Sequence, residues 1–245
     1  MYSKSKILII GDSYSSNPIY DNDTDTKHGW IDCFGKHHRK LKIKNLSKPG
    51  ASFWRQVDSL LQQDFKNYRY CILFWSYPIR IYRRNVEKFV DGWLDPMPWE
   101  RRESVTNIFS KIINDTRHLQ KAYQSLYDDR SIDFENMEKL KAYFALSYIY
   151  NEIYSKHKDT TFINFQCFDW LEDTSMPNLK TSNNIYNGST NLRSVCREEK
   201  EYNNLNHMDP RQHDIFSNIM IKLIDDLETK KKRSKIIDIT ELAKS

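Results

Sequence analysis

Long apolar segments are missing from this chain of 245 residues, although 39% of its residues are hydrophobic. No run approaches the roughly 20 apolar residues that a membrane-spanning helix needs, and the mean hydropathy is −0.77. The sequence therefore argues against an integral membrane protein and predicts no membrane partner. Residues 1–5 lead into a short apolar strand without a small-residue cleavage site, so we expect no signal peptide and synthesis in the cytoplasm.

Closely spaced cysteines are also missing. The four cysteines are scattered, and no CxxC pair that could hold zinc or act as a redox centre is present. Cys71 and Cys167 lie within apolar runs, so we expect them to be buried thiols. The chain has neither a P-loop nor a GxGxxG motif, which leaves nucleotide binding with little support. We expect no cofactor and no metal, and we place His37 and His38 at an exposed helix end.

Positive charge is in modest excess, with 38 Lys and Arg residues against 33 Asp and Glu residues. Part of the excess lies in the run Lys-Lys-Lys-Arg at residues 230–233. Such a run can contact nucleic acid, but it more commonly forms a solvated segment. We therefore expect residues 229–245 to be a basic tail, and we do not expect nucleic acid as a partner.

Four short apolar runs are predicted to be strands, at residues 6–10, 41–45, 70–75 and 161–167. They are nearly continuous rather than alternating, which is typical of strands buried on both faces of a parallel sheet. Apolar stripes of helical period separate them. The residues of these stripes are Trp54, Val57, Leu60 and Leu61; eight residues between Val105 and Leu126; Met137, Leu140, Phe144 and Tyr148; and Ile215, Ile219, Met220, Leu223 and Leu227.

This alternation predicts one α/β domain over residues 1–228 with a parallel sheet covered on both faces. The long segment between the third and fourth strands predicts a helical-hairpin insertion at about residues 84–158. Residues 174–200 are polar and are predicted to be a long loop. Residues 236–242 are apolar, and we treat them as a separate docking element.

Three short segments of the sequence suggest a catalytic site. Gly11-Asp12-Ser13 follows the first strand directly, where open parallel sheets bind ligands and where a helix N-terminus favours a developing anion. Gly50, in the loop after the second strand, can offer its backbone N–H to an oxyanion. His207 precedes the last helix and is the usual kind of base for a serine nucleophile. Each piece alone is also explained by an ordinary turn or helix cap.

The order of these pieces resembles the SGNH/GDSL hydrolase family, and the resemblance covers roughly residues 6–227. It implies a flavodoxin-like three-layer α/β/α sandwich. It also implies Ser13 as nucleophile, His207 as general base, and the backbone N–H groups of Ser13 and Gly50 as an oxyanion hole. Members of the family cleave esters, often acetyl groups on glycans or acyl chains on lipids.

The chain departs from the family pattern after the third strand, where the family has an oxyanion-hole asparagine. Here residues 75–80 read Trp-Ser-Tyr-Pro-Ile-Arg, a segment similar to those of divergent SGNH-like proteins of bacteriophages. We assign Ser76 as the replacement donor in the oxyanion hole. We expect Trp75, Tyr77, Arg80 and Asp12 to contact substrate.

A second departure lies three residues before His207, where the family usually has an aspartate and this chain has Asn204. An amide can still orient an imidazole, although it stabilises an imidazolium less than a carboxylate does. Two hypotheses follow. The first is a serine esterase or deacetylase acting on a small acyl ester, such as one on an O-acetylated glycan. The alternative is a catalytically impaired SGNH-like protein that recognises glycans or serves in a homo-oligomer or a phage virion.

Overall fold

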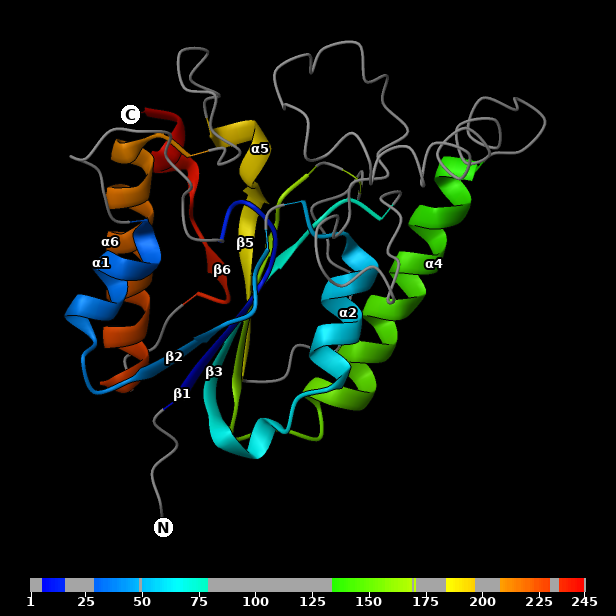
Figure 1. Ribbon diagram of the computed structural model, residues 1–245, viewed down its shortest axis with the longest axis horizontal. Coiled ribbons are helices and arrows are strands. Elements are labelled where there is room, and N and C mark those ends of the chain that lie inside the picture. Colours follow the sequence, from blue (N-terminus) through cyan, green and yellow to red (C-terminus); the bar gives the residue numbers. More distant parts are fainter. Residues whose placement is uncertain are drawn as a thin grey trace, which may run out of the picture.

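The computed structural model describes residues 6–15, 29–48, 50–78, 134–168, 170, 184–196, 208–229 and 234–244. In these residues six parallel strands form one sheet in the order β2-β1-β3-β4-β5-β6. Helices cover both faces of the sheet (Figure 1), so the fold is an α/β sandwich of the flavodoxin-like kind. Among the helices described, none is long and apolar enough to cross a bilayer.

The four predicted strands are confirmed, with ends within two residues of the expected ones. They are β1 (Lys6–Ile10), β2 (Lys42–Asn45), β3 (Tyr68–Trp75) and β4 (Thr161–Gln166). β3 lies between β1 and β4, and its residues from Tyr70 to Trp75 are buried on both faces. This double burial explains why its apolar run does not alternate.

The prediction of one long loop over residues 174–200 is wrong for its central part. β5 (Ile185–Asn191) pairs in parallel with β4, and the short helix α5 (Leu192–Val195) follows it directly. Only Ile185 and Tyr186 in β5 are large and apolar. The strand therefore lacks the hydrophobic run by which the other strands were recognised.

The sheet also extends beyond the predicted domain end at residue 228. β6 (Ile236–Ile237) pairs with β5, and a short 3₁₀ helix at Thr240–Lys244 follows it. Ile237, Ile239 and Leu242 are buried in the core. The apolar piece expected to dock separately is thus the sixth strand of the sheet and its capping turn, whereas residues 230–233 lie outside the described ranges.

Helices α1 (Trp30–His37) and α6 (Pro210–Glu228) cover one face of the sheet, and α2 (Phe53–Leu61) and α4 (Phe134–Tyr148) cover the other (Figure 1). α1 and α6 pack closely, with the rings of Trp30 and Phe216 in edge-on contact at 5.0 Å. Trp30 lies at the start of α1 and Phe216 near the start of α6. The two helices therefore begin at the same end of the sandwich.

The predicted insertion is described only in its second half. α4 confirms the second helix of the hairpin, but its apolar stripe does not face the core. The exposed residues are Met137, Leu140, Tyr143, Phe144 and Tyr148, and the buried ones are Ala142 and Leu146. The helix expected at residues 105–126 lies outside the described residues.

Candidate active site

The strand order places Ser13, Gly50 and Ser76 at one edge of the sheet. β1 lies between β2 and β3, so the chain moves to one side of β1 first and to the other side afterwards. In open α/β sheets, ligands bind beside such a reversal, outside the carboxyl ends of the strands. Ser13 follows β1, Ser76 follows β3 and Gly50 follows the neighbouring β2.

Ser13 lies in a tight turn at residues 12–15. The Tyr14 N–H donates to Asp12 Oδ1 at 3.1 Å, and the Ser15 N–H donates to the Asp12 carbonyl at 3.2 Å. Gly11 is required at the end of β1, because a Cβ there would lie 2.6 Å from Cβ of Phe74 on β3. This close approach holds the turn against the middle of the sheet. Ser13 itself is only 4% exposed.

Hydrogen bonds join this turn to the loop that carries Gly50. The Lys48 N–H donates to the Gly11 carbonyl at 3.2 Å, and the Asn45 amide donates to the Ser15 carbonyl at 3.0 Å. The Ser15 and Ser47 hydroxyl groups are also hydrogen-bonded, at 2.9 Å. The two loops expected to carry the nucleophile and an oxyanion donor are therefore in direct contact.

The loop after β2 contains a tight turn at Gly50. Gly50 has a φ of 73°, and the Ala51 N–H donates to the Lys48 carbonyl at 3.1 Å. A positive φ at the third position and this hydrogen bond are the features of a type II turn, which favours glycine there. Ser52 then caps α2, since its Oγ accepts the N–H of Arg55.

The third-strand loop is held from both sides. The Trp75 indole N–H donates to Asn164 Oδ1 at 3.1 Å, and the backbone N–H of Ser76 donates to Gln56 Oε1 at 2.8 Å. Both Trp75 and Ser76 have no exposed surface. Tyr77 is half-buried, and its ring lies 6.2 Å from that of Phe168.

The predicted substrate contacts differ in their surroundings. Asp12 is completely buried, and its Oδ1 accepts the Tyr14 N–H and the Cys167 thiol. This gives Asp12 the turn-capping role that was the alternative interpretation. Trp75 is equally buried. Tyr77 retains exposed surface, whereas Arg80 lies outside the described residues.

A path of hydrogen bonds links the turn of Ser13 to the start of α6. The Trp30 indole N–H donates to the Tyr14 carbonyl at 3.0 Å, and the Trp30 backbone N–H donates to His213 Nδ1 at 3.2 Å. His213 lies on the first turn of α6, four residues after the capping residue Asp209. α6 therefore begins near the carboxyl edge of β1. His207 and Asn204 precede α6 in the sequence and lie outside the described residues.

The start of α6 is fixed independently of His213. Asp209 and Gln212 form a reciprocal capping box, with the expected Pro210 in the first turn. The Gln212 amide also donates to the carbonyl groups of Val195 and Leu242, at 3.3 and 3.1 Å. The helix start is thus held by α5 and by the turn after β6.

Burial dominates the titration of the groups around this edge. It raises the pKa of the Tyr14 phenol well above its ordinary value, with Cys167 the next largest cause. Burial raises the pKa of Cys196 to about 12, and it also raises the pKa of the fully buried Cys71. These two thiols are therefore protonated at neutral pH and are poor nucleophiles. Cys71 and Cys167 are buried, as expected.

Gln56 is a residue that the sequence analysis missed. Its side chain is buried, its Oε1 accepts the Ser76 N–H, and within the described structure its Nε2 has no hydrogen-bond partner. A buried amide nitrogen of this kind is uncommon and is a candidate donor to a ligand. The signal was a glutamine on the inward face of α2, between Phe53 and Leu60.

The chain matches no known family model, and no curated protein sequence matches it.

Proposed function

We propose that the protein is a serine hydrolase of the SGNH type that cleaves small acyl esters, with O-acetylated glycans as the substrate class. The proposal rests mainly on the hydrogen-bonded contact between the turn of Ser13 and the loop of Gly50, at the carboxyl edge of β1 and β2. In the family that the chain resembles, these two loops carry the nucleophile and an oxyanion donor. The path from Tyr14 through Trp30 to His213 also supports it, since it ties the start of α6 to the same edge.

In the proposed reaction, Ser13 Oγ attacks the ester carbonyl while His207 takes the hydroxyl proton. The backbone N–H groups of Ser13 and Gly50 hold the oxyanion, and each such donor lowers the activation barrier by about 3 kcal/mol. Collapse of the intermediate releases the alcohol, which receives the proton from His207. A water molecule, deprotonated by the same imidazole, then attacks the acyl-enzyme and frees the acid. Asn204 orients the imidazole through its side-chain oxygen.

Gln56 is proposed to replace the asparagine that the third-strand loop lacks. Both residues supply a carboxamide, so the donor chemistry is the same. The bond from the Ser76 N–H fixes Oε1 of Gln56 and thereby the plane of the amide. Its Nε2 is then a preorganised donor in a water-poor environment, where such donors stabilise developing charge most. The Ser76 hydroxyl remains the other candidate at this position.

The decisive experiment compares the wild type with Ser13→Ala and with the control Ser155→Ala. Ser155 precedes β4 and so lies at the opposite, amino-terminal edge of the sheet. We expect turnover of p-nitrophenyl acetate by the wild type and the control, and none above background by Ser13→Ala. A fluorophosphonate probe should label Ser13, as located by peptide mass spectrometry. Equal rates in all three proteins, with no labelled Ser13, would refute the proposal.

The second candidate function is glycan recognition without turnover, by a protein made in the cytoplasm and built into a virion. Its support is the third-strand loop, in which Ser76 is fully buried and no asparagine is present. This candidate predicts that an O-acetylated oligosaccharide binds equally well to the wild type and to Ser13→Ala, without loss of acetate. Release of acetate that depends on Ser13 would exclude it.

A further inference from the structure

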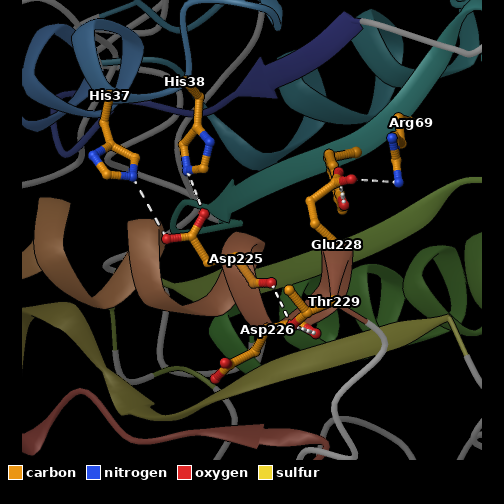
Figure 2. A network of polar contacts seen from close by, with 8 residues as sticks. His37, His38, Arg69, Asp225, Asp226, Glu228 and Thr229 are labelled. Atoms are coloured by element: carbon orange, nitrogen blue, oxygen red, sulfur yellow. Dashed lines mark hydrogen bonds and ion pairs between the residues drawn. The ribbon is translucent and has the colours of Figure 1, made fainter.

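Three side chains with metal-binding chemistry converge where the end of α1 meets the second half of α6. His37 is the last residue of α1, His38 follows it, and Asp225 faces them from α6 (Figure 2). His37 Nε2 lies 3.5 Å from Asp225 Oδ2, and His38 Nε2 lies 4.0 Å from Asp225 Oδ1. One ligand atom from each residue lies within 4.8 Å of the other two.

His38 can offer Nε2 to a metal ion. Its side chain is only 9% exposed, and Nε2 has no hydrogen-bond partner in the described structure. In the neutral ring with its proton on Nδ1, the Nε2 lone pair faces the carboxylate of Asp225. An imidazole lone pair and a carboxylate that face one another favour a cation between them.

We propose that His37, His38 and Asp225 bind one divalent transition-metal ion, with Zn²⁺ as the best fit, and that the ion fastens the end of α1 to α6. Imidazole nitrogen and carboxylate oxygen bind Zn²⁺ at about 2.0–2.2 Å, so two ligand atoms of a tetrahedral site lie about 3.3–3.5 Å apart. The 3.5 Å between His37 Nε2 and Asp225 Oδ2 already meets this spacing. All three ligand atoms lie within 4.8 Å of one another, which exceeds the spacing by at most ~1.3 Å, so small side-chain movements of little more than ~1 Å complete the site.

The surroundings of the three ligands fit this site. The side chains of His37 and Asp225 are 51% and 53% exposed, which leaves room for a water molecule as fourth ligand.

The neighbouring acidic residue Glu228 is not part of the site. It is engaged by Arg69 at 2.6 Å and by the Tyr70 hydroxyl at 2.6 Å. Asp226 points away from the two histidines (Figure 2). The ligand set is therefore two imidazoles and one carboxylate, which suits zinc, nickel or copper better than magnesium or calcium.

The test titrates the full-length chain, freed of metal with EDTA, with ZnCl₂ by calorimetry and measures its melting temperature. We expect one Zn²⁺ per chain and a higher melting temperature, with no effect of MgCl₂. His37→Ala and Asp225→Asn should each weaken Zn²⁺ binding at least about tenfold, since even supporting residues of metal sites contribute that much. The matched control is Asp226→Asn, which should bind as the wild type does.

Since His37 and Asp225 are half-exposed, both variants should fold, and circular dichroism without metal should confirm this. Equal Zn²⁺ affinity in the wild type, His37→Ala and Asp225→Asn would overturn the proposal, because the ion would then lie elsewhere. Failure of the wild type to bind Zn²⁺ would overturn it as well.

Discussion

The backbone N–H of Trp30 donates a 3.2 Å hydrogen bond to Nδ1 of His213. α1 begins after Gly29, which has no side chain to cap the helix, so its first N–H would otherwise lack an intrahelical partner. An imidazole from α6 supplies the missing acceptor. Because the imidazole accepts through a lone pair, this contact requires a neutral His213.

The first prediction concerns the pH dependence of stability. Burial lowers the pKa of His213 to about 4, below its ordinary value of 6.5. The unfolded chain therefore binds a proton at a higher pH than the folded one. The contribution of neutral His213 to the free energy of unfolding is complete above pH 6.5. It is lost as the pH falls through the folded pKa of His213, and the loss amounts to up to about 3 kcal/mol. Urea unfolding between pH 7 and pH 4 measures it.

The matched variant is His213→Asn, whose amide oxygen can accept the Trp30 N–H but does not titrate. Its free energy of unfolding should fall less steeply with pH than that of the wild type. Parallel pH profiles for the two proteins would show that another group causes the loss of stability at low pH.

The second prediction concerns the glycine before the proposed nucleophile. Gly11→Ala would place Cβ 2.6 Å from Phe74 Cβ, so the end of β1 must shift, at a cost of about 1–3 kcal/mol. Gly35→Ala is the control, because its Cβ meets only the flexible end of Ile43 at 3.2 Å and alanine favours a helix. Denaturant unfolding should show a clear decrease in the free energy of unfolding for Gly11→Ala and little or no decrease for Gly35→Ala. Equal losses would contradict the packing argument.

The third prediction concerns β6. Ile237 is 2% exposed and Ile236 is 62% exposed, since neighbouring residues of a strand face opposite sides. Ile237→Ala should lower the free energy of unfolding by about 2–4 kcal/mol. Ile236→Ala should change it by about 0.5 kcal/mol or less. If both variants unfold like the wild type, residues 236–237 are not an integral strand.

The fourth prediction concerns Gln56 in the proposed esterase. Gln56→Glu retains an oxygen for the Ser76 N–H, removes the Nε2 donor and, when ionised, adds a negative charge beside the proposed oxyanion. We expect kcat to fall about 100-fold or more with little change in KM, as for the loss of an oxyanion donor. Thermal unfolding of the variant controls for stability. An unchanged kcat would leave the Ser76 hydroxyl as the candidate donor.

Much of the fold follows from the sequence, because the central strands are buried on both faces and display continuous apolar runs. The same reasoning failed for β5, in which Asn187, Gly188 and Ser189 interrupt any such run. It also missed the pairing of β6, which consists of two residues and depends on contacts far away in the chain. In α4 the sequence period identified a helix correctly but not its orientation, since Phe144 is 63% exposed.

The candidate site was predictable only where loops directly follow strands. The placement of Ser13, Gly50 and Ser76 at one edge follows from strand order alone. Gln56 and the contact of His38 with Asp225 were not predictable, because each depends on a tertiary approach between distant segments. The burial of Asp12 and Trp75 was equally invisible, since their residue types are common at substrate-binding surfaces.

The anchoring of Gln212 by the Leu242 carbonyl has a consequence for folding during synthesis. The ribosome releases β1 to β4 first, so the centre of the sheet can assemble early. Until residues 236–244 emerge, however, β5 presents an open edge, to which strands of other molecules can add. During this interval α6 also lacks the hydrogen bond from the Gln212 amide to the Leu242 carbonyl. Released chains that are truncated between residues 229 and 235 should therefore be the species most prone to aggregate and most dependent on chaperones.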